Sequence, residues 1–444
     1  MKNFYNRSME EQSIRKTDLP KCRFCGSPLQ HTFVDLGMQP LCESYLGPNQ
    51  LNQMEPFYPL HTYVCDKCFL VQLEEYVTPK EIFSEYAYFS SFSKAWLKHA
   101  KNYVTMITDK LKLDQNSQIV EIASNDGYLL QYFIQKRIPV LGVEPAANVA
   151  ETAIKKGIPT LVEFFGLKTA RDLSTKKKNA DLLIGNNVLA QVPNLNEFVE
   201  SLKILLKPSG IINMEFPHLM KLIDGNQFDT IYHEHFSYFS LITIENVFAA
   251  HGLTIFDVEE LPTHGGSLRI YACHTEDSSK PVTGHVAQLR GIEEAEGFTN
   301  LKKYFSFAEK VKETKRNLLD ALINLKRGKK SVVGYGAPGK GNTLLNYCGV
   351  RSDFLNYTVD RNPYKQGKFL PGTHIPIFHP NKIEKTKPDY VLILPWNIKE
   401  EIMKQLSYIE KWNGRFIIPI PKVSSYEANG IEIETPIWKS GGCE

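Results

Sequence analysis

The sequence predicts an α/β protein of three domains, in which a small cysteine-rich domain precedes two larger domains with parallel sheets. Three observations lead to this prediction. At about 100–200 residues per domain, a chain of 444 residues is too long for one core. Two Cys-x-x-Cys pairs lie in a turn-rich N-terminal segment, and apolar strand patterns alternate with amphipathic helix patterns in the remainder. The expected domains are 1–80, 81–285 and 286–444.

The four N-terminal cysteines predict a structural zinc site. Each pair places two thiolates at a turn, and two such pairs make a closed set of four sulfur ligands. A closed set leaves no coordination position for a substrate, so the metal would stabilise a domain with little core. A catalytic zinc and four ordinary thiols are the alternatives, and Cys42 or His61 could replace one ligand. The predicted ligands are Cys22, Cys25, Cys65 and Cys68.

The central domain shows strands separated by helices, which predicts a parallel sheet with helices on both faces. Its last two strands are joined only by PTHGG, so this end of the sheet should be antiparallel. The expected helices are 93–111, 129–136, 148–157, 195–210, closed by Pro208 and Gly210, and 242–252. The expected strands are 118–123, 139–145, 181–187, 211–216, 253–261 and 267–274.

The last part of the chain begins with a long amphipathic helix at 300–326, which would act as a connector or packing arm with solvated Lys and Arg side chains. A second α/β unit follows. Its first strand leads into GYGAPGKGNTLL, a Gly-rich turn that opens a helix, which is the usual setting for phosphate binding. Asp360 ends the next strand and could face a ribose, so a nicotinamide-dependent dehydrogenase is one alternative.

Composition argues against other partners. A net charge of +3 is too small to indicate nucleic acid, and the basic runs 176–178 and 325–330 fit a loop and a helix end. A zinc-knuckle nucleic-acid binder would need basic patches interleaved with aromatics. The first residues lack an apolar leader, and no run of about 18 apolar residues occurs. We expect a cytoplasmic protein without a membrane partner.

A ligand crevice is expected at the carboxyl ends of the central strands. The first strand ends in EIASNDGYLL, which is not GxGxxG but carries small residues for close backbone approach. The next strand ends in a glutamate, about 20 residues further on, that could bind a ribose diol. Helix caps and turns are the alternative explanation. The candidate cofactor-binding residues are Glu121, Ser124, Asn125, Asp126, Gly127, Glu144, Pro145, Asn186 and Asn187.

The turn, the glutamate and the terminal hairpin together resemble a class I S-adenosylmethionine methyltransferase with a Rossmann-like sheet, because dinucleotide domains generally lack that hairpin. Ordered motifs extend this resemblance to the deoxysugar C-methyltransferases, which act on nucleotide-linked 4-keto-6-deoxy sugars. The resemblance implies S-adenosylmethionine and structural zinc as cofactors. The motifs are CRFCGSPL, VCDKCFLVQL, EYAYFSSFS, EIASNDGYLL, GVEPAANVA, GNNVLAQVPNLNEFV, IYHEHFSYFSL, THGGSLRIYACH, VVGYGAPGKGNTLLN and VDRNPYKQGKFLPGTHIPI.

The segment IYHEHFSYFSL would then supply the acid–base chemistry. Removing a hydrogen from the carbon beside a ketone needs a base, and a neutral imidazole can accept that proton. We predict His235 as the base and C3 as the methylated carbon; C5 or a small aromatic acceptor is the alternative. A solvated helix cap is the structural alternative for this segment. The other predicted residues are catalytic Glu234, Tyr232 and Tyr86, and substrate-binding Tyr88, His233 and Lys340.

One position departs from the family pattern. Family members often have histidine in the NVLAHVPD-like segment, where this chain has Gln191. Glutamine can form hydrogen bonds but cannot act as a base. With glutamine at this position, proton abstraction would depend more strongly on His235, or the substrate would differ from that of other family members.

Overall fold

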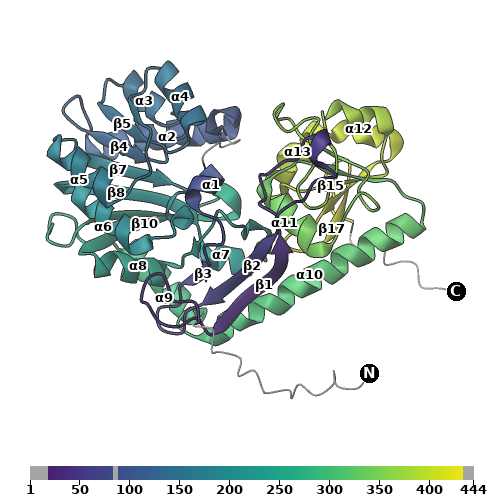
Figure 1. The fold of residues 1–444 in the computed structure, drawn as a ribbon, viewed down its shortest axis with the longest axis horizontal. Helices are drawn as coiled ribbons and strands as arrows, with labels where there is room; N and C mark the ends of the chain where they lie inside the picture. Colours follow the sequence, from purple (N-terminus) through teal and green to yellow (C-terminus); the bar gives the residue numbers. More distant parts are fainter. Residues whose placement is uncertain (1–18, 84–88, 434–444) are drawn as a thin grey trace, which may run out of the picture.

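The computed structural model describes residues 19–83 and 89–433. They form three sheets, and the long helix α10 runs beneath the domains and connects them (Figure 1). Among the helices of the described ranges, none combines the length and the apolar composition needed to cross a membrane.

The central sheet has seven strands in the order β10-β11-β8-β7-β4-β5-β6. β11 pairs antiparallel with both β10 and β8, whereas the other neighbours are parallel. This confirms the predicted antiparallel end. The strands are β4 (Ile119–Ile122), β5 (Val140–Val143), β6 (Thr160–Leu161), β7 (Ala180–Asn186), β8 (Leu206–Pro217), β10 (Leu253–Leu261) and β11 (Ser267–His274). Strand β6 was not predicted from the sequence.

The predicted helices of this domain begin and end close to the expected positions, with one exception, whereas the helices at 167–175 and 219–224 were not predicted from the sequence. The predicted helix at 195–210 ends at Leu205, and β8 begins at Leu206, so that boundary prediction was wrong. The register of β7 and β8 shifts between Ala180 and Leu182, and the irregularity accommodates Pro208. The helices are α2 (Lys94–Leu111), α3 (Leu130–Gln135), α4 (Ala147–Lys155), α5 (Leu167–Thr175), α6 (Leu195–Leu205), α7 (Leu219–Asp224) and α8 (Leu241–Ala250).

The N-terminal domain forms an antiparallel sheet of β1 (His31–Gln39), β2 (Tyr58–Val64) and β3 (Val71–Leu73), and α1 (Pro79–Phe83) follows. Its fourth strand, β9 (Ser237–Tyr238), comes from the central part of the chain. The small domain is therefore joined to the segment that contains the predicted base.

The C-terminal domain has a six-stranded sheet in the order β14-β13-β12-β15-β16-β17. Before it, α10 packs against β1, where the rings of Phe33 and Phe307 stack at 4.8 Å; this confirms a packing arm. The elements of this part are α9 (Gly284–Ala295), α10 (Leu301–Arg327), β12 (Val332–Tyr335), α11 (Gly339–Cys348), β13 (Thr358–Val359), β14 (Ile377–Phe378), α12 (Asn381–Thr386), β15 (Tyr390–Ile393), α13 (Lys399–Gln405), β16 (Arg415–Ile418) and β17 (Ser424–Glu427).

Candidate active site

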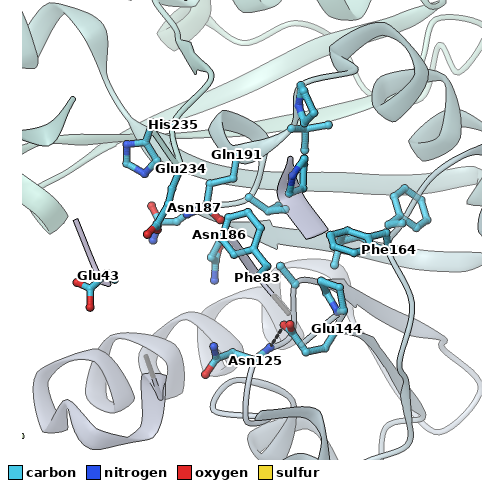
Figure 2. A pocket seen from close by; sticks show the side chains of 18 of the residues that line it. Glu43, Phe83, Asn125, Glu144, Phe164, Asn186, Asn187, Gln191, Glu234 and His235 are labelled. Carbon is cyan, nitrogen blue, oxygen red and sulfur yellow. Dashed lines mark hydrogen bonds between the residues drawn. The ribbon is translucent and has the colours of Figure 1, made fainter. Parts of the chain in front are cut away.

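A cavity of about 1060 Å³ lies where the three domains meet. Its wall combines the segment after β1, the carboxyl ends of the central strands and the turn before α11. In Figure 2, Glu234 and His235 lie on one side of the view and Glu144 and Asn125 on the other, with Asn186 and Asn187 between them. The predicted cofactor crevice and the predicted base therefore share one cavity.

Glu144 organises the cofactor side of the cavity. Its Oε2 accepts the backbone N–H of Asn125 at 2.9 Å, and its Oε1 accepts that of Ala146 at 2.8 Å. Burial raises the pKa of Glu144, while these two hydrogen bonds favour its charged form. Each carboxylate oxygen keeps a second lone pair for a ligand hydroxyl. The predicted cofactor residues that line the cavity are Asn125, Glu144, Pro145, Asn186 and Asn187.

Four other predicted cofactor residues lie outside the cavity lining. Gly127 has a φ of +75°, and a Cβ there would lie 2.1 Å from Cδ1 of Ile158, so this glycine permits close packing. The Oδ2 of Asp126 accepts the N–H of Ser91 at 3.3 Å. The other two are Glu121 and Ser124; Glu121 is fully buried, which raises its pKa well above the usual range. These four residues support the turn without lining the cavity.

The predicted base, His235, is buried at the cavity wall. Its Nδ1 lies 3.1 Å from the carbonyl oxygen of Thr230. A carbonyl can only accept, so Nδ1 carries the proton and Nε2 keeps a lone pair. Burial lowers the pKa of His235 to about 4, with charge on His264 and Lys340 contributing less. The imidazole is therefore neutral at neutral pH and can accept a proton through Nε2.

Two neighbours in the same segment also line the cavity. The ring of Tyr232 lies 4.2 Å from that of His235, measured between centroids, and burial raises the pKa of this phenol well above its usual range. The Oε1 of Glu234 accepts a long hydrogen bond of 3.8 Å from the Sγ of Cys42. Cys42 thus belongs to the cavity wall.

His233 is not among the residues that line the cavity, which argues against its predicted role as a substrate contact. Its Nε2 lies 3.2 Å from the carbonyl oxygen of Pro59, and its ring packs edge-on against Tyr58. With exposures of 3% for His233 and 6% for His235, the solvated-cap alternative does not hold. Tyr86 and Tyr88 lie outside the described residues.

The C-terminal domain contributes Lys340 from the first turn of α11. Its Nζ lies 4.7 Å from the ring centre of Trp396 and donates to Oδ1 of Asn397 at 3.0 Å. Burial lowers the pKa of Lys340, and the negative charge of Asp229 opposes this shift. Lys340 lines the cavity.

Other parts of the chain pack against one side of the Gly-rich turn before α11. The carbonyl of Ala337 accepts from the hydroxyl of Tyr45 at 2.6 Å and from Nζ of Lys365 at 2.9 Å. A Cβ on Gly339 would lie 2.9 Å from the Sγ of Cys42. Asp360 accepts the N–H of Ala337 at 2.7 Å, so its carboxylate closes the turn. This packing argues against the dinucleotide alternative.

His264 is a cavity residue that was not predicted from the sequence. It lies in the connection between β10 and β11 and lines the cavity. Its Nε2 lies 3.2 Å from Nδ2 of Asn187, and its ring meets Trp96 edge-on at 5.2 Å. The THGG sequence signalled only a turn; a histidine beside two glycines at the carboxyl edge of the sheet was the available clue.

The four predicted zinc ligands come together. Their sulfur atoms all lie within 4.8 Å of one another, with 3.5 Å between Cys22 and Cys68 and 3.5 Å between Cys25 and Cys65. A tetrahedron with zinc–sulfur bonds of about 2.3 Å has edges near this length. His61, the alternative ligand, forms a side-chain hydrogen bond with Thr32 instead. The residues fit a structural zinc.

Comparison with known proteins agrees with this organisation. Family models match as a zinc binding domain at residues 22–83, a methyltransferase domain at 96–258 and a C-methyltransferase C-terminal domain at 262–421. The C-methyltransferase NovU of Streptomyces niveus is 33% identical over 404 residues, which cover 91% of this chain and 96% of that protein.

Two solved structures are also similar. The PH0226 protein of Pyrococcus horikoshii OT3 has 16% identity and a TM-score of 0.35, covering 46% of this chain and 99% of that one. Magnesium protoporphyrin IX methyltransferase of Synechocystis PCC 6803 has 13% identity and a TM-score of 0.32, covering 40% and 83%. The full-length relative, the three family models and the strand order together show that the chain belongs to the S-adenosylmethionine-dependent C-methyltransferases.

Proposed function

We propose that this enzyme methylates the carbon beside the ketone, at C3, of a nucleotide-linked 4-keto-6-deoxy sugar. The observation that carries the proposal is the neutral imidazole of His235, which has Nε2 unprotonated and lines the cavity that contains the cofactor crevice. A C-methyltransferase must create a carbon nucleophile, and a base beside the cofactor can do so.

The cavity joins the cofactor crevice to the C-terminal domain. Its volume of about 1060 Å³ lies at the upper end of the range of about 300–1,000 Å³ that is typical of ligand pockets. The part of the cavity wall that belongs to the C-terminal domain includes the first turn of α11, with Lys340. The positive end of a helix dipole and an ammonium group both favour a diphosphate. The acceptor would therefore place its nucleotide against the C-terminal domain and its sugar beside His235.

The chain's residues then have defined tasks. His235 takes the proton from the carbon beside the ketone through Nε2, and the electron pair left behind forms an enolate. Tyr232 and Glu234 shape and polarise the pocket around it. When bound, S-adenosylmethionine supplies a methyl group on a positively charged sulfur. The enolate carbon bonds to that methyl as the carbon–sulfur bond breaks, and the ketone is restored.

Gln191 fits this division of tasks. It lines the cavity together with His235. Its amide can orient a sugar hydroxyl, but it cannot accept a proton as a base. The proposed proton abstraction therefore depends on the imidazole of His235.

Mass spectrometry in heavy water tests the proposed function. The enzyme is incubated with S-adenosylmethionine and a panel of nucleotide-linked 4-keto-6-deoxy sugars. We expect one panel member to gain one methyl group, and to exchange one hydrogen for deuterium beside the ketone when S-adenosylmethionine is withheld. Methylation of another carbon, such as C5, would replace the C3 assignment. Neither methylation nor exchange across the panel would contradict the proposal.

Glu144 is the residue to change for cofactor binding. We expect Glu144→Gln to weaken S-adenosylmethionine binding about 10- to 100-fold, because hydrogen bonds to a charged group contribute about 1.5–3 kcal/mol. Isothermal titration calorimetry with S-adenosylhomocysteine measures the change. Glu151→Gln, on the outer face of α4 where Glu151 pairs with Lys155, is the matched control. Equal affinities for both variants would remove Glu144 from the cofactor site.

A further inference from the structure

His264 occupies a left-handed backbone conformation that is uncommon for residues other than glycine. Its φ of 55° and ψ of 17° are left-handed, and a non-glycine residue there carries a strain of about 1 kcal/mol or more. Gly265 and Gly266 follow with φ values of +94° and +124°. A Cβ on Gly265 would lie 2.8 Å from the ring of Trp396, and one on Gly266 would lie 2.7 Å from the Lys221 side chain. The loop therefore requires glycine after the histidine.

Several contacts hold this loop in place. The hydroxyl of Thr263 donates to Oε1 of Glu215 at 2.8 Å, and Glu215 in turn pairs with Arg269 at 2.8 Å. Nε2 of Gln227 donates to the carbonyl of Gly265 at 2.7 Å. Strained residues persist only where their surroundings hold them firmly, and they concentrate at functional sites. The contacts thus fix the loop that carries His264 at the cavity wall.

The hydrogen bond from Asn187 sets the tautomer of His264. The amide nitrogen Nδ2 donates to Nε2 at 3.2 Å, so Nε2 is the acceptor and the proton lies on Nδ1. Nδ1 has no hydrogen-bond partner among the described residues. Burial lowers the pKa of His264 to about 4, and the charge of Lys340 acts in the same direction. The imidazole is therefore a neutral donor at the cavity wall.

We propose that His264 is a second catalytic residue, whose Nδ1–H donates a hydrogen bond to the ketone oxygen and stabilises the negative charge that develops there. This rests on the enolate route proposed above. Both imidazoles line the same cavity. His235 becomes positive when it takes the proton, and a neutral donor does not repel it. The two rings would thus divide the task, one as base and one as donor.

His264→Gly keeps the left-handed backbone, which glycine adopts without strain, and removes the imidazole donor. Asparagine also tolerates this conformation, but its amide N–H can still donate to the ketone oxygen, so glycine is the sharper change. We expect His264→Gly to slow both deuterium exchange beside the ketone and methyl transfer by about 10²- to 10³-fold, the loss usual for one oxyanion donor. Affinity for S-adenosylhomocysteine should be nearly unchanged. Free imidazole can enter the space that the side chain leaves, and it should restore part of the exchange rate. His285→Gly, at a histidine with 70% side-chain exposure, is the control.

The outcomes separate this inference from the proposed function. Normal exchange in His264→Gly together with lost methyl transfer would overturn the donor role and place His264 at the methyl donor. Lost affinity for S-adenosylhomocysteine, or no recovery with imidazole in a folded His264→Gly, would also overturn it. Absence of exchange in the unaltered enzyme across the whole panel would instead reject the enolate route itself.

Discussion

His235→Gln should lower kcat by about two to four decades, the usual contribution of a general base. Glutamine can still donate to the carbonyl of Thr230, which His235 contacts at 3.1 Å, but it offers no basic nitrogen. Folding and S-adenosylmethionine affinity should be retained, because His235 lies on the other side of the cavity from Glu144 (Figure 2). Single-turnover methyl transfer and solvent deuterium exchange measure the loss.

The neighbouring histidine provides a matched control. His233 is equally buried but contacts Pro59 outside the cavity lining, so His233→Gln should change kcat little. The pH profile gives a second check. Because the pKa of His235 is lowered to about 4, kcat/KM should show no acid limb near 6.5, the ordinary value for imidazole, while the protein stays folded. If His235→Gln and His233→Gln lowered kcat equally, the loss would come from disturbed packing and not from the removal of a base.

Cys65→Ser should release zinc and lower the free energy of unfolding by about 4 kcal/mol or more, as expected for loss of a structural metal. Three remaining thiolates cannot complete the closed set of four. Activity should also fall, because β3 follows this cysteine pair and is hydrogen-bonded to the catalytic segment: Leu73 N donates to Phe236 O at 3.0 Å. Metal analysis and thermal unfolding measure the two effects.

Cys273→Ser is the control for this second prediction. Cys273 is buried in β11 and does not belong to the four-sulfur cluster, so its replacement should retain the metal. If Cys65→Ser kept its zinc and its melting temperature, the cluster would not be a metal site.

Much of the sheet could be predicted because its strands are short apolar segments bounded by turn residues. β6, with two residues, is too short to show a pattern. The start of β8 was misplaced because LKILLKP continues the helical spacing, whereas pairing with β7 draws Leu206 into the strand. Neighbouring strands overrode the local preference of this segment.

The site was predicted where its residues lie close in sequence. The spacing of each cysteine pair is local, and His235 stands within a dense polar segment. The sequence could not show that His235 lines the cavity and His233 does not, because His233 contacts Pro59, which is distant in the sequence. His264 was missed for the same reason: its partners, Asn187 and Trp96, are brought to it only by the sheet.

The sharing of one sheet by β3 and β9 limits how this family can be recombined. A chimera that exchanged residues 22–83 alone would pair a foreign strand with Ser237 and Tyr238. A shift in the register of that pairing would displace His235, the proposed base, which lies two residues before Ser237. Nε2 of Gln72 also donates to the Sγ of Cys22 at 3.2 Å, so the strand and the metal ligands move as a unit. Functional chimeras should therefore exchange the zinc-binding domain and residues 228–241 together, although the two segments are far apart in the sequence.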